Sequence, residues 1–464
     1  MKRPRKTAGK KKALWGAGFD AQPGAALARL SVSHPFDRRL AEADVAGSLA
    51  HARGLFRRRL LSRAALARIQ RALRAIGQEI AAGKFRFSDA DEDIHLNVER
   101  RLIELAGDAG RRIHAGRSRN DQVALDLRLW TLGAIDRSSA AIRSLGGAIL
   151  TRAEQFLEKE VVVAARTHLR SAQPVLLAHV FHAWVEMLLR DLGRLADARK
   201  RTAVSPLGSG ACAGSTLTLD REGVAKELGL SSVTANSIDA VSDRDFAAEF
   251  EGAAALTMTH LSRIAEDLIL WTGDELRLFA LSDATATGSS MMPQKKNPDS
   301  LELTRGKAGR VIGNLVATLT IVKGLPLSYD RDLQETQEPL FETADALELS
   351  LAAVEEVIAG LRLLPEKERA PIDPSSLATD VAEELVRRGM AFRTAHERVA
   401  RWSRKAAVGK RDLREVVWIE APELRSFAES LSPESSVRRR DGTGGTSPRR
   451  VRAALRRARR QLEA

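Results

Sequence analysis

The chain has 464 residues, of which 44% are hydrophobic and 29% charged, and this balance excludes a disordered polymer. It has no run of about 18 consecutive apolar residues, which excludes a transmembrane helix, so no membrane partner is expected. Cys212 is the single cysteine; a disulfide framework and a cysteine-based metal cluster are therefore excluded, and a cytoplasmic location is expected.

The formal net charge of +14 is concentrated at the two ends of the chain. Residues 1–12 carry +7 and residues 435–464 carry +8, so the segment between them is close to neutral. A protein that tracks nucleic acid usually interleaves its cations with aromatic side chains, whereas only 4% of the residues here are aromatic. Nucleic-acid binding is therefore not expected, and residues 1–12 are predicted to form a disordered basic tail.

Helical periodicity dominates the rest of the chain and strand patterns are scarce, which predicts an all-α fold. An N-terminal helical domain is predicted over residues 13–114. Unusually long periodic stretches then predict five long helices, over residues 120–160, 175–200, 243–272, 298–323 and 335–363. Such lengths are typical of a bundle, placed here in a central domain over residues 115–366. A proline-rich stretch then opens a small helical C-terminal domain over residues 367–464.

The first polar segment, residues 114–122, precedes the first long helix and contains Arg117, Ser118, Arg119 and Asn120. These side chains form a candidate anion site, because the N-terminus of a helix presents free N–H groups and a positive dipole. A capping loop with salt bridges is an equally good interpretation of the segment.

The second polar segment, residues 166–174, contains Thr167 and His168 and is expected to lead through Pro174 into the next helix. A histidine transfers protons near neutral pH, so His168 is a candidate catalytic acid or base. A single histidine in a loop is also common as a structural residue, and that alternative stays open.

The third polar segment, residues 288–302, is the most specific. A glycine and two serines at its start are typical of a mobile, tightly turning loop. Asn297 and Pro298 fit the N-cap and the first residue of the next helix. Lys295 and the free N–H groups there are suited to stabilising a developing negative charge. Glu302, about one turn into the helix, is placed to polarise an imidazole.

At residues 288–297 the pattern Gly-Ser-Ser-x-Met-Pro-x-Lys-x-Asn resembles the shared motif of the fumarase/aspartase superfamily. Further segments resemble the argininosuccinate lyase family, which includes the delta-crystallins: residues 37–52, 114–122, 167–168, 208–211, 220–222, 242–246, 329–334 and 444–446. The Ser-Arg-Asn-Asp element at residues 118–121 separates this family from fumarases, aspartases and adenylosuccinate lyases.

The resemblance implies cleavage of argininosuccinate to arginine and fumarate, an anti β-elimination without a cofactor, in arginine biosynthesis. Lys295 and Asn297 match the positions that hold the substrate carboxylate in its doubly charged aci-form. Ser289 matches the loop serine usually assigned as the base, and His168, oriented by Glu302, is implied to protonate the leaving nitrogen. The residues fit either role, so which of Ser289 and His168 is the acid stays open.

The resemblance also implies how the substrate is held and how the site is assembled. Substrate binding is implied for Ser33, Arg117, Ser118, Arg119, Asn120, Thr167, Tyr329, Gln334 and Gln337. In this family the loops of one site meet only when different subunits combine. The implied fold therefore has three domains, and its bundle helices form the core of a homotetramer with shared active sites.

Two other hypotheses stay open, and a departure from the family pattern permits the first of them. The family usually has a lysine at the position of Gln337, and either Arg170 or Arg331 could restore the missing charge. A sister lyase that releases fumarate from another adduct is a second hypothesis, and a non-catalytic crystallin-like structural protein is a third. No metal is expected, because no further ligand motif accompanies the one helix face with metal-type spacing, which carries His179, His182 and Glu186.

Overall fold

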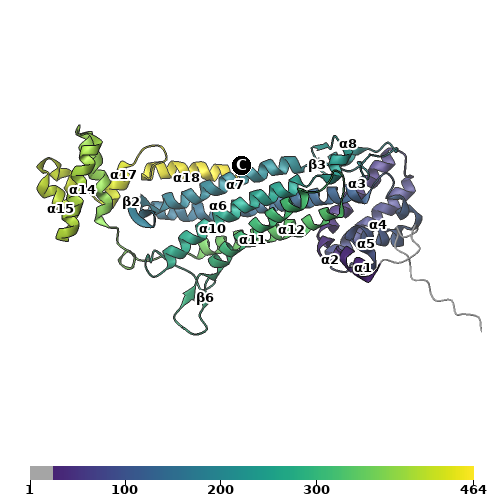
Figure 1. Ribbon diagram of the computed structural model, residues 1–464, viewed down its shortest axis with the longest axis horizontal. Coiled ribbons are helices and arrows are strands. Elements are labelled where there is room, and N and C mark those ends of the chain that lie inside the picture. Colours follow the sequence, from purple (N-terminus) through teal and green to yellow (C-terminus); the bar gives the residue numbers. More distant parts are fainter. Residues whose placement is uncertain (1–23, 464) are drawn as a thin grey trace, which may run out of the picture. The chain divides into compact units, whose positions relative to one another are not determined.

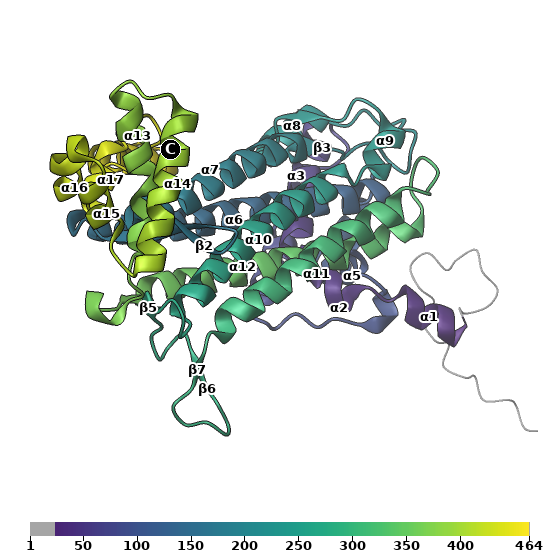
Figure 2. The same ribbon diagram turned by 60° about the vertical axis from the view of Figure 1, so that its left-hand side comes forward.

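The computed structural model describes residues 24–463, which are mostly helical (Figures 1 and 2). These residues form two compact units, and each of the five long helices contributes to both. The basic tail predicted over residues 1–12 lies outside the described residues. Within residues 24–463, no helix combines the length and the apolar character that crossing a bilayer requires.

The first unit comprises the chain up to Asp136, Leu195–Gly252 and Ile312–Ala344. Leu73, Ile76 and Ile94 are fully buried in its N-terminal helices. Besides parts of the long helices, it contains α1 (Ala25–Ser31), α2 (His34–Asp37), α3 (Ala41–Arg57), α4 (Arg63–Ala81), α5 (Ile94–Ala106), the parallel strands β3 (Val204–Ser205) and β4 (Ser232–Val233), α8 (Arg221–Glu227), α9 (Ser237–Ser242) and the 3₁₀ helices η2 (Arg38–Leu40), η3 (Asp89–Asp91), η4 (Gly107–Arg112) and η5 (Arg331–Thr336).

The second unit comprises Arg137–Arg194, Ala253–Val311 and Asp345–Ala464. Its three antiparallel pairs are β1 (Val162–Thr167) with β2 (Arg170–Leu176), β5 (Phe279–Ala280) with β8 (Arg362–Leu363), and β6 (Thr287–Gly288) with β7 (Lys296–Asn297). Its remaining helices are η6 (Glu366–Glu368), η7 (Pro374–Leu377), α13 (Ala378–Arg387), α14 (Phe392–Gly409), α15 (Leu413–Glu420), η8 (Pro422–Leu424), α16 (Arg425–Ser430), α17 (Pro433–Arg439) and α18 (Pro448–Glu463).

The C-terminal helices enclose a core of their own, in which Val381, Val417 and Leu424 are fully buried. This core falls inside the C-terminal segment that was separated by sequence. The division of the chain into domains over residues 13–114, 115–366 and 367–464 stays a prediction.

The five long helices are confirmed, as α6 (Arg119–Glu158), α7 (Leu177–Thr202), α10 (Asp245–Thr272), α11 (Asp299–Val322) and α12 (Gln337–Gly360). Figures 1 and 2 both show them running alongside one another. Apolar residues recur along them at the helical period, and Leu127, Ile142 and Ile149 are accordingly buried in α6. The helical content therefore follows from the sequence pattern, with short strands in the segments between helices.

Residues 162–176 form a β-hairpin, so the expectation that Pro174 leads into a helix is wrong. Pro174 lies in β2 opposite Ala164, and α7 begins at Leu177. A proline is tolerated there because the sheet has only two strands, and both are edge strands with unpaired positions. Consecutive valines at the start of β1 favour the extended backbone over a helix.

The helix α11 begins one residue later than predicted. Asn297 pairs with Thr287 in the sheet of β6 and β7, so its backbone is extended. The carbonyl of Pro298 accepts hydrogen bonds from the backbone N–H groups of Leu301 (2.9 Å) and Glu302 (3.1 Å). Pro298 therefore occupies the capping position that the sequence assigned to Asn297.

Candidate functional site

A pocket of about 520 Å³ in the first unit gathers many of the predicted substrate-binding residues. Its size lies within the range of small-molecule sites. The predicted residues that line it are Ser33, Arg119, Asn120, Tyr329, Gln334 and Gln337. Sequence reasoning named Arg331 only as a replacement for the missing lysine, and it missed other residues of the wall: Asp37, Glu92, Asp93, His95, Glu99 and His114.

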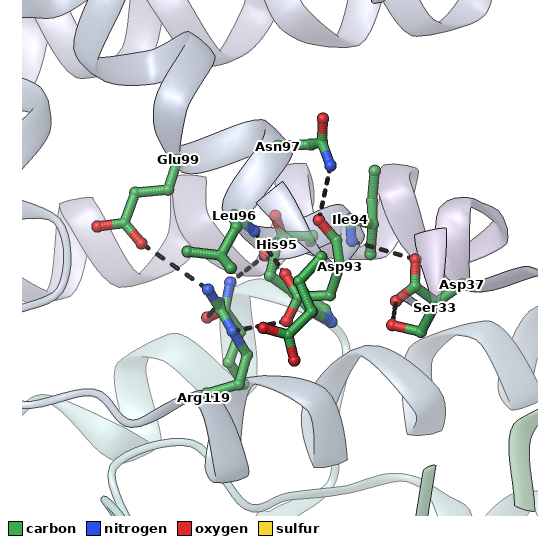
Figure 3. A network of polar contacts seen from close by, with 12 residues as sticks. Ser33, Asp37, Asp93, Ile94, His95, Leu96, Asn97, Glu99 and Arg119 are labelled. Carbon is green, nitrogen blue, oxygen red and sulfur yellow. Dashed lines mark hydrogen bonds and ion pairs between the residues drawn. The ribbon is translucent and has the colours of Figure 1, made fainter. Parts of the chain in front are cut away.

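Ser33 is fixed by a buried carboxyl group (Figure 3). Its hydroxyl donates to Oδ2 of Asp37 at 2.6 Å, and Oδ1 of Asp37 accepts from the backbone N–H of Ile94 at 3.1 Å. Burial raises the pKa of Asp37 to about 6, although nearby His95 and the hydroxyl of Ser33 act in the opposite direction. The carboxyl group of Asp37 thus orients the hydroxyl of Ser33 at the pocket wall.

Arg119 is held by acidic groups on two sides (Figure 3). Its Nε lies 3.1 Å from Oδ2 of Asp93, and its Nη2 lies 3.9 Å from Oε2 of Glu99. Its Nη1 donates to the side-chain oxygen of Gln122. These contacts fix the guanidinium in one orientation at the first turn of α6, where it faces the pocket.

Asn120 is tied to the glycine-rich loop over residues 208–214. Its Nδ2 donates to the carbonyl of Ala211 at 3.2 Å. Two backbone N–H groups of the same loop donate to Oδ2 of neighbouring Asp121, at 2.8 and 2.9 Å. The loop therefore fixes the start of α6, and it holds the side chain of Asn120 at the pocket wall.

Arg117 and Ser118 do not line the pocket. Arg117 is 8% exposed, and its Nη1 donates to the hydroxyl of Ser48 at 2.8 Å. The hydroxyl of Ser118 accepts from the backbone N–H of Asn120 at 3.3 Å. In this chain both residues make the contacts of a capping loop, and their predicted binding of carboxylates stays untested.

Gln337 has a buried side-chain oxygen at the pocket wall. It is 4% exposed, and its Oε1 has no hydrogen-bond partner among the described residues. Arg331, which could replace the missing lysine, is already engaged: it pairs with Glu92 and donates to the carbonyl of Ser31 at 3.0 Å. The other candidate, Arg170, is exposed on β2 and belongs to the second unit.

His168 lies at the tip of the β1–β2 hairpin in the second unit. With Leu169 it forms a two-residue turn, and the φ angles of 54° and 59° are those of a type I′ turn. Neither residue is a glycine or an asparagine, so each left-handed conformation costs on the order of 1 kcal/mol. Thr167 and His168 are exposed there. Strain that places a histidine at an exposed tip favours a functional role over a structural one.

Ser289 lies in the loop between β6 and β7, which projects from the helices around it (Figures 1 and 2). Its Oγ accepts hydrogen bonds from the backbone N–H groups of Met291 (3.3 Å) and Met292 (3.1 Å). Two donors on one hydroxyl oxygen stabilise negative charge on that oxygen. The turn thus directs two N–H donors at the hydroxyl oxygen of Ser289, which sequence reasoning could not derive.

Lys295 and Asn297 line a second cavity, of about 950 Å³, together with Glu302. Lys296 is neutralised by an ion pair with Asp283, whereas no ion pair of Lys295 is found among residues 24–463. Lys295 is thus the cation of this loop that is available to an anionic ligand.

The predicted contact between Glu302 and His168 is not made in the single chain. Within the described residues no hydrogen bond joins them, and they line different cavities of the second unit. On the helix face with metal-type spacing, Nε2 of His182 lies 3.1 Å from Oε1 of Glu186. Within the second unit, the hairpin tip and the β6–β7 loop are therefore two separate sets of site residues.

Comparisons with known proteins give a consistent result over almost the whole chain. A family model described as Lyase matches residues 22–313, and one described as Argininosuccinate lyase C-terminal matches residues 375–438. The argininosuccinate lyase of Roseiflexus sp. (strain RS-1) is 48% identical over 455 residues, which cover 97% of this chain and 100% of that protein. The argininosuccinate lyase of Thioalkalivibrio sulfidiphilus (strain HL-EbGR7) is 48% identical, with 97% of each chain covered. A solved EDDS lyase in complex with formate has a TM-score of 0.80 at 27% identity, and covers 94% of this chain and 88% of its own.

Proposed function

This chain belongs to the argininosuccinate lyase family, and we propose that it cleaves argininosuccinate to arginine and fumarate by a β-elimination that needs no cofactor. It is a carbon–nitrogen lyase, and its reaction belongs to arginine biosynthesis. The turn at Ser289 is the main support for assigning catalytic roles to particular residues, because two backbone N–H groups there donate to the hydroxyl oxygen.

The difficult step removes a weakly acidic C–H proton next to a carboxylate. The electron pair left on carbon is delocalised into that carboxylate, so the rate depends on stabilising the extra negative charge. Lys295 and Asn297 are proposed to bind this aci-carboxylate, and the N-terminus of α11 adds its dipole. The lack of an ion pair of Lys295 among the described residues supports this role.

Ser289 is proposed as the base and His168 as the acid that protonates the leaving guanidino nitrogen. An ordinary serine is far too weakly acidic for this role, so its two N–H donors must lower the cost of ionisation. His168 needs an orienting carboxylate, and Glu302 is proposed to supply it from another subunit. Variants of Ser289 and His168 distinguish this assignment from the reverse one. The variant that lacks only the acid should still exchange the proton at the substrate carbon without eliminating, whereas the variant that lacks the base should not.

The pocket of the first unit suits the cationic half of the substrate. Its wall has more acidic than guanidinium groups, with Asp37, Glu92, Asp93 and Glu99 against Arg119 and Arg331. The arginine part of argininosuccinate carries a guanidino group and an α-ammonium, which pair favourably with carboxylates. Ser33, Asn120, Tyr329 and Gln334 are proposed to bind that part through hydrogen bonds.

A steady-state assay tests the proposed function. Purified protein given argininosuccinate is expected to release fumarate, followed by its ultraviolet absorbance, and arginine in equal amounts. Turnover only with another fumarate-releasing adduct would show a sister lyase, and the departure at Gln337 is the observation that favours this second candidate. A protein inactive on every such adduct would contradict both.

Replacing Gln337 with lysine is expected to lower KM for argininosuccinate about tenfold, because a charged hydrogen bond to a carboxylate contributes about 1.5 kcal/mol. Gln337 lines the pocket with an unpartnered oxygen, and Arg331 is engaged elsewhere. A Gln337→Met variant, which keeps the size but loses both amide groups, is expected to raise KM. An unchanged KM in both variants would contradict a binding role.

The proposed assembly is a homotetramer in which different subunits complete each site. Ile312, Val316 and Leu319 of α11 are 45%, 56% and 52% exposed, and their spacing places them on one face of the helix. An apolar stripe of this kind on a long helix is typical of a helix that packs against another copy. This stripe supports the assembly, and the separation of the hairpin tip from the β6–β7 loop within the second unit agrees with it.

A Val316→Arg variant is expected to dissociate the assembly. The native mass of the wild-type protein is predicted to be about four times 50.6 kDa. The variant should form smaller species and lose at least about tenfold in kcat, because its sites stay incomplete. Val408→Arg on α14, also at an exposed apolar position, is the matched control and should keep both mass and activity. A wild-type monomer with full activity would contradict the proposal.

A further inference from the structure

A buried cluster of charged residues lies at the wall of the pocket in the first unit. His95 of α5 lies between two carboxylates, with its Nδ1 3.5 Å from Oδ1 of Asp44 on α3 and 3.2 Å from Oδ2 of Asp126 on α6. All three side chains are at most 2% exposed. Oδ2 of Asp44 and both carboxylate oxygens of Asp126 have no hydrogen-bond partner among the described residues. Nδ1 of His95 is likewise without a hydrogen bond among these residues, so the charge of His95 compensates the two carboxylates through its ion pairs with Oδ1 of Asp44 and Oδ2 of Asp126.

Charge balance indicates what occupies the centre of this cluster. Two carboxylates face His95, and the buried guanidinium of Arg117 acts on both of them. A protonated His95 and Arg117 together neutralise the two carboxylates, which a buried site requires. The three side chains Asp44, His95 and Asp126 also offer ligand atoms within 4.8 Å of one another. A divalent cation bound there would, together with Arg117, exceed the charge of the two carboxylates and leave a net positive charge buried.

The environment of His95 favours the imidazolium. Burial is the largest single effect and lowers the pKa of His95, but the contacts with Asp126 and Asp44, and the more distant Asp93, outweigh it and raise that pKa to about 10. Burial and the negative charge of Asp44 raise the pKa of Asp126, whereas His95 and Arg117 act to lower it. The imidazolium is thus expected to persist over the pH range in which the enzyme works.

The cluster connects to the pocket through Asp44. The side-chain amide of Gln122 donates to Oδ1 of Asp44, and its oxygen accepts from Nη1 of Arg119. Arg119 lines the pocket beside His95 (Figure 3). We propose that His95 is a positioning residue: it holds Asp44, which fixes Gln122, and Gln122 in turn fixes Arg119 for the substrate. The inference rests on the proposed function, in which Arg119 holds the substrate.

The kinetic test compares two buried histidines that each pair with a carboxylate. His95→Gln removes the cation, and KM for argininosuccinate is expected to rise about 10- to 100-fold while kcat changes less than about threefold. His260, whose Nδ1 lies 2.7 Å from Oδ2 of buried Asp191 in the second unit, supplies the control His260→Gln. Both variants should lower the melting temperature, and only His95→Gln should raise KM. An equal rise of KM in the control would overturn the proposal.

A double variant tests the connection itself. Gln122→Leu removes both hydrogen bonds of the link and is expected to raise KM as His95→Gln does. Because the two residues act in series, the combined variant should be no worse than the more damaging single variant. Fully additive effects would overturn the proposal.

Two measurements on the wild-type protein do not depend on how the variants fold. Nitrogen-15 NMR of labelled histidines at about pH 8 should show both ring nitrogens of His95 protonated, well above the ordinary histidine pKa of about 6.5. A neutral ring would overturn the proposal, as would a stoichiometric divalent cation in the purified wild-type protein. Failure of the proposed function would show separately, as absent turnover in the wild-type assay.

Discussion

Replacing Ser289 with alanine is expected to lower kcat about 10²- to 10⁴-fold and to change KM little. The substitution removes the oxygen proposed to accept the substrate proton. The variant also takes away the acceptor shared by the backbone N–H groups of Met291 and Met292, which can donate to water instead in this exposed loop. The loss should therefore appear in the chemical step, as followed by fumarate absorbance under saturating substrate.

The neighbouring serine provides the matched control for this experiment. Ser290 is exposed in the same loop, but neither of the two N–H donors is directed at it. Ser290→Ala is therefore expected to keep kcat within about threefold of the wild type. If Ser289→Ala kept more than a tenth of the wild-type kcat, Ser289 would not be the base, and His168 would take that role.

The long helices were predictable because their apolar residues repeat at the period of an α-helix over many turns. Leu127, Ile142 and Ile149 show this along α6, and each is buried where the pattern placed it. The ends of the helices were predicted less well, since they depend on competition between helical and extended backbone conformations at a few residues. The hairpin at residues 162–176 was missed because its turn uses His168 and Leu169 in left-handed conformations that their residue types disfavour.

The site was predictable only where residues adjacent in sequence form one motif. The segments around Asn120 and Ser289 were identified in this way. The cluster of Asp44, His95 and Asp126 was not, because its members come from three different helices and meet only after packing. A charged residue at an apolar position of a helical repeat is the signal that could have found each of them. Whether the separate loops form one site depends on assembly, which the sequence of one chain indicates only through its family.

Replacing Lys295 with methionine is expected to lower kcat about 10²- to 10³-fold, because the ammonium group is proposed to stabilise the negative charge that develops on the carboxylate as the C–H bond breaks. Methionine keeps most of the length of the side chain and removes only its charge. Lys296, the next residue, gives a sharp control, since its ion pair with Asp283 already neutralises it. Lys296→Met should therefore keep kcat within about threefold of the wild type. If the two variants lost activity equally, the effect would come from the general charge of the loop. Loss confined to Lys295→Met would instead place a single ammonium group at the developing aci-carboxylate.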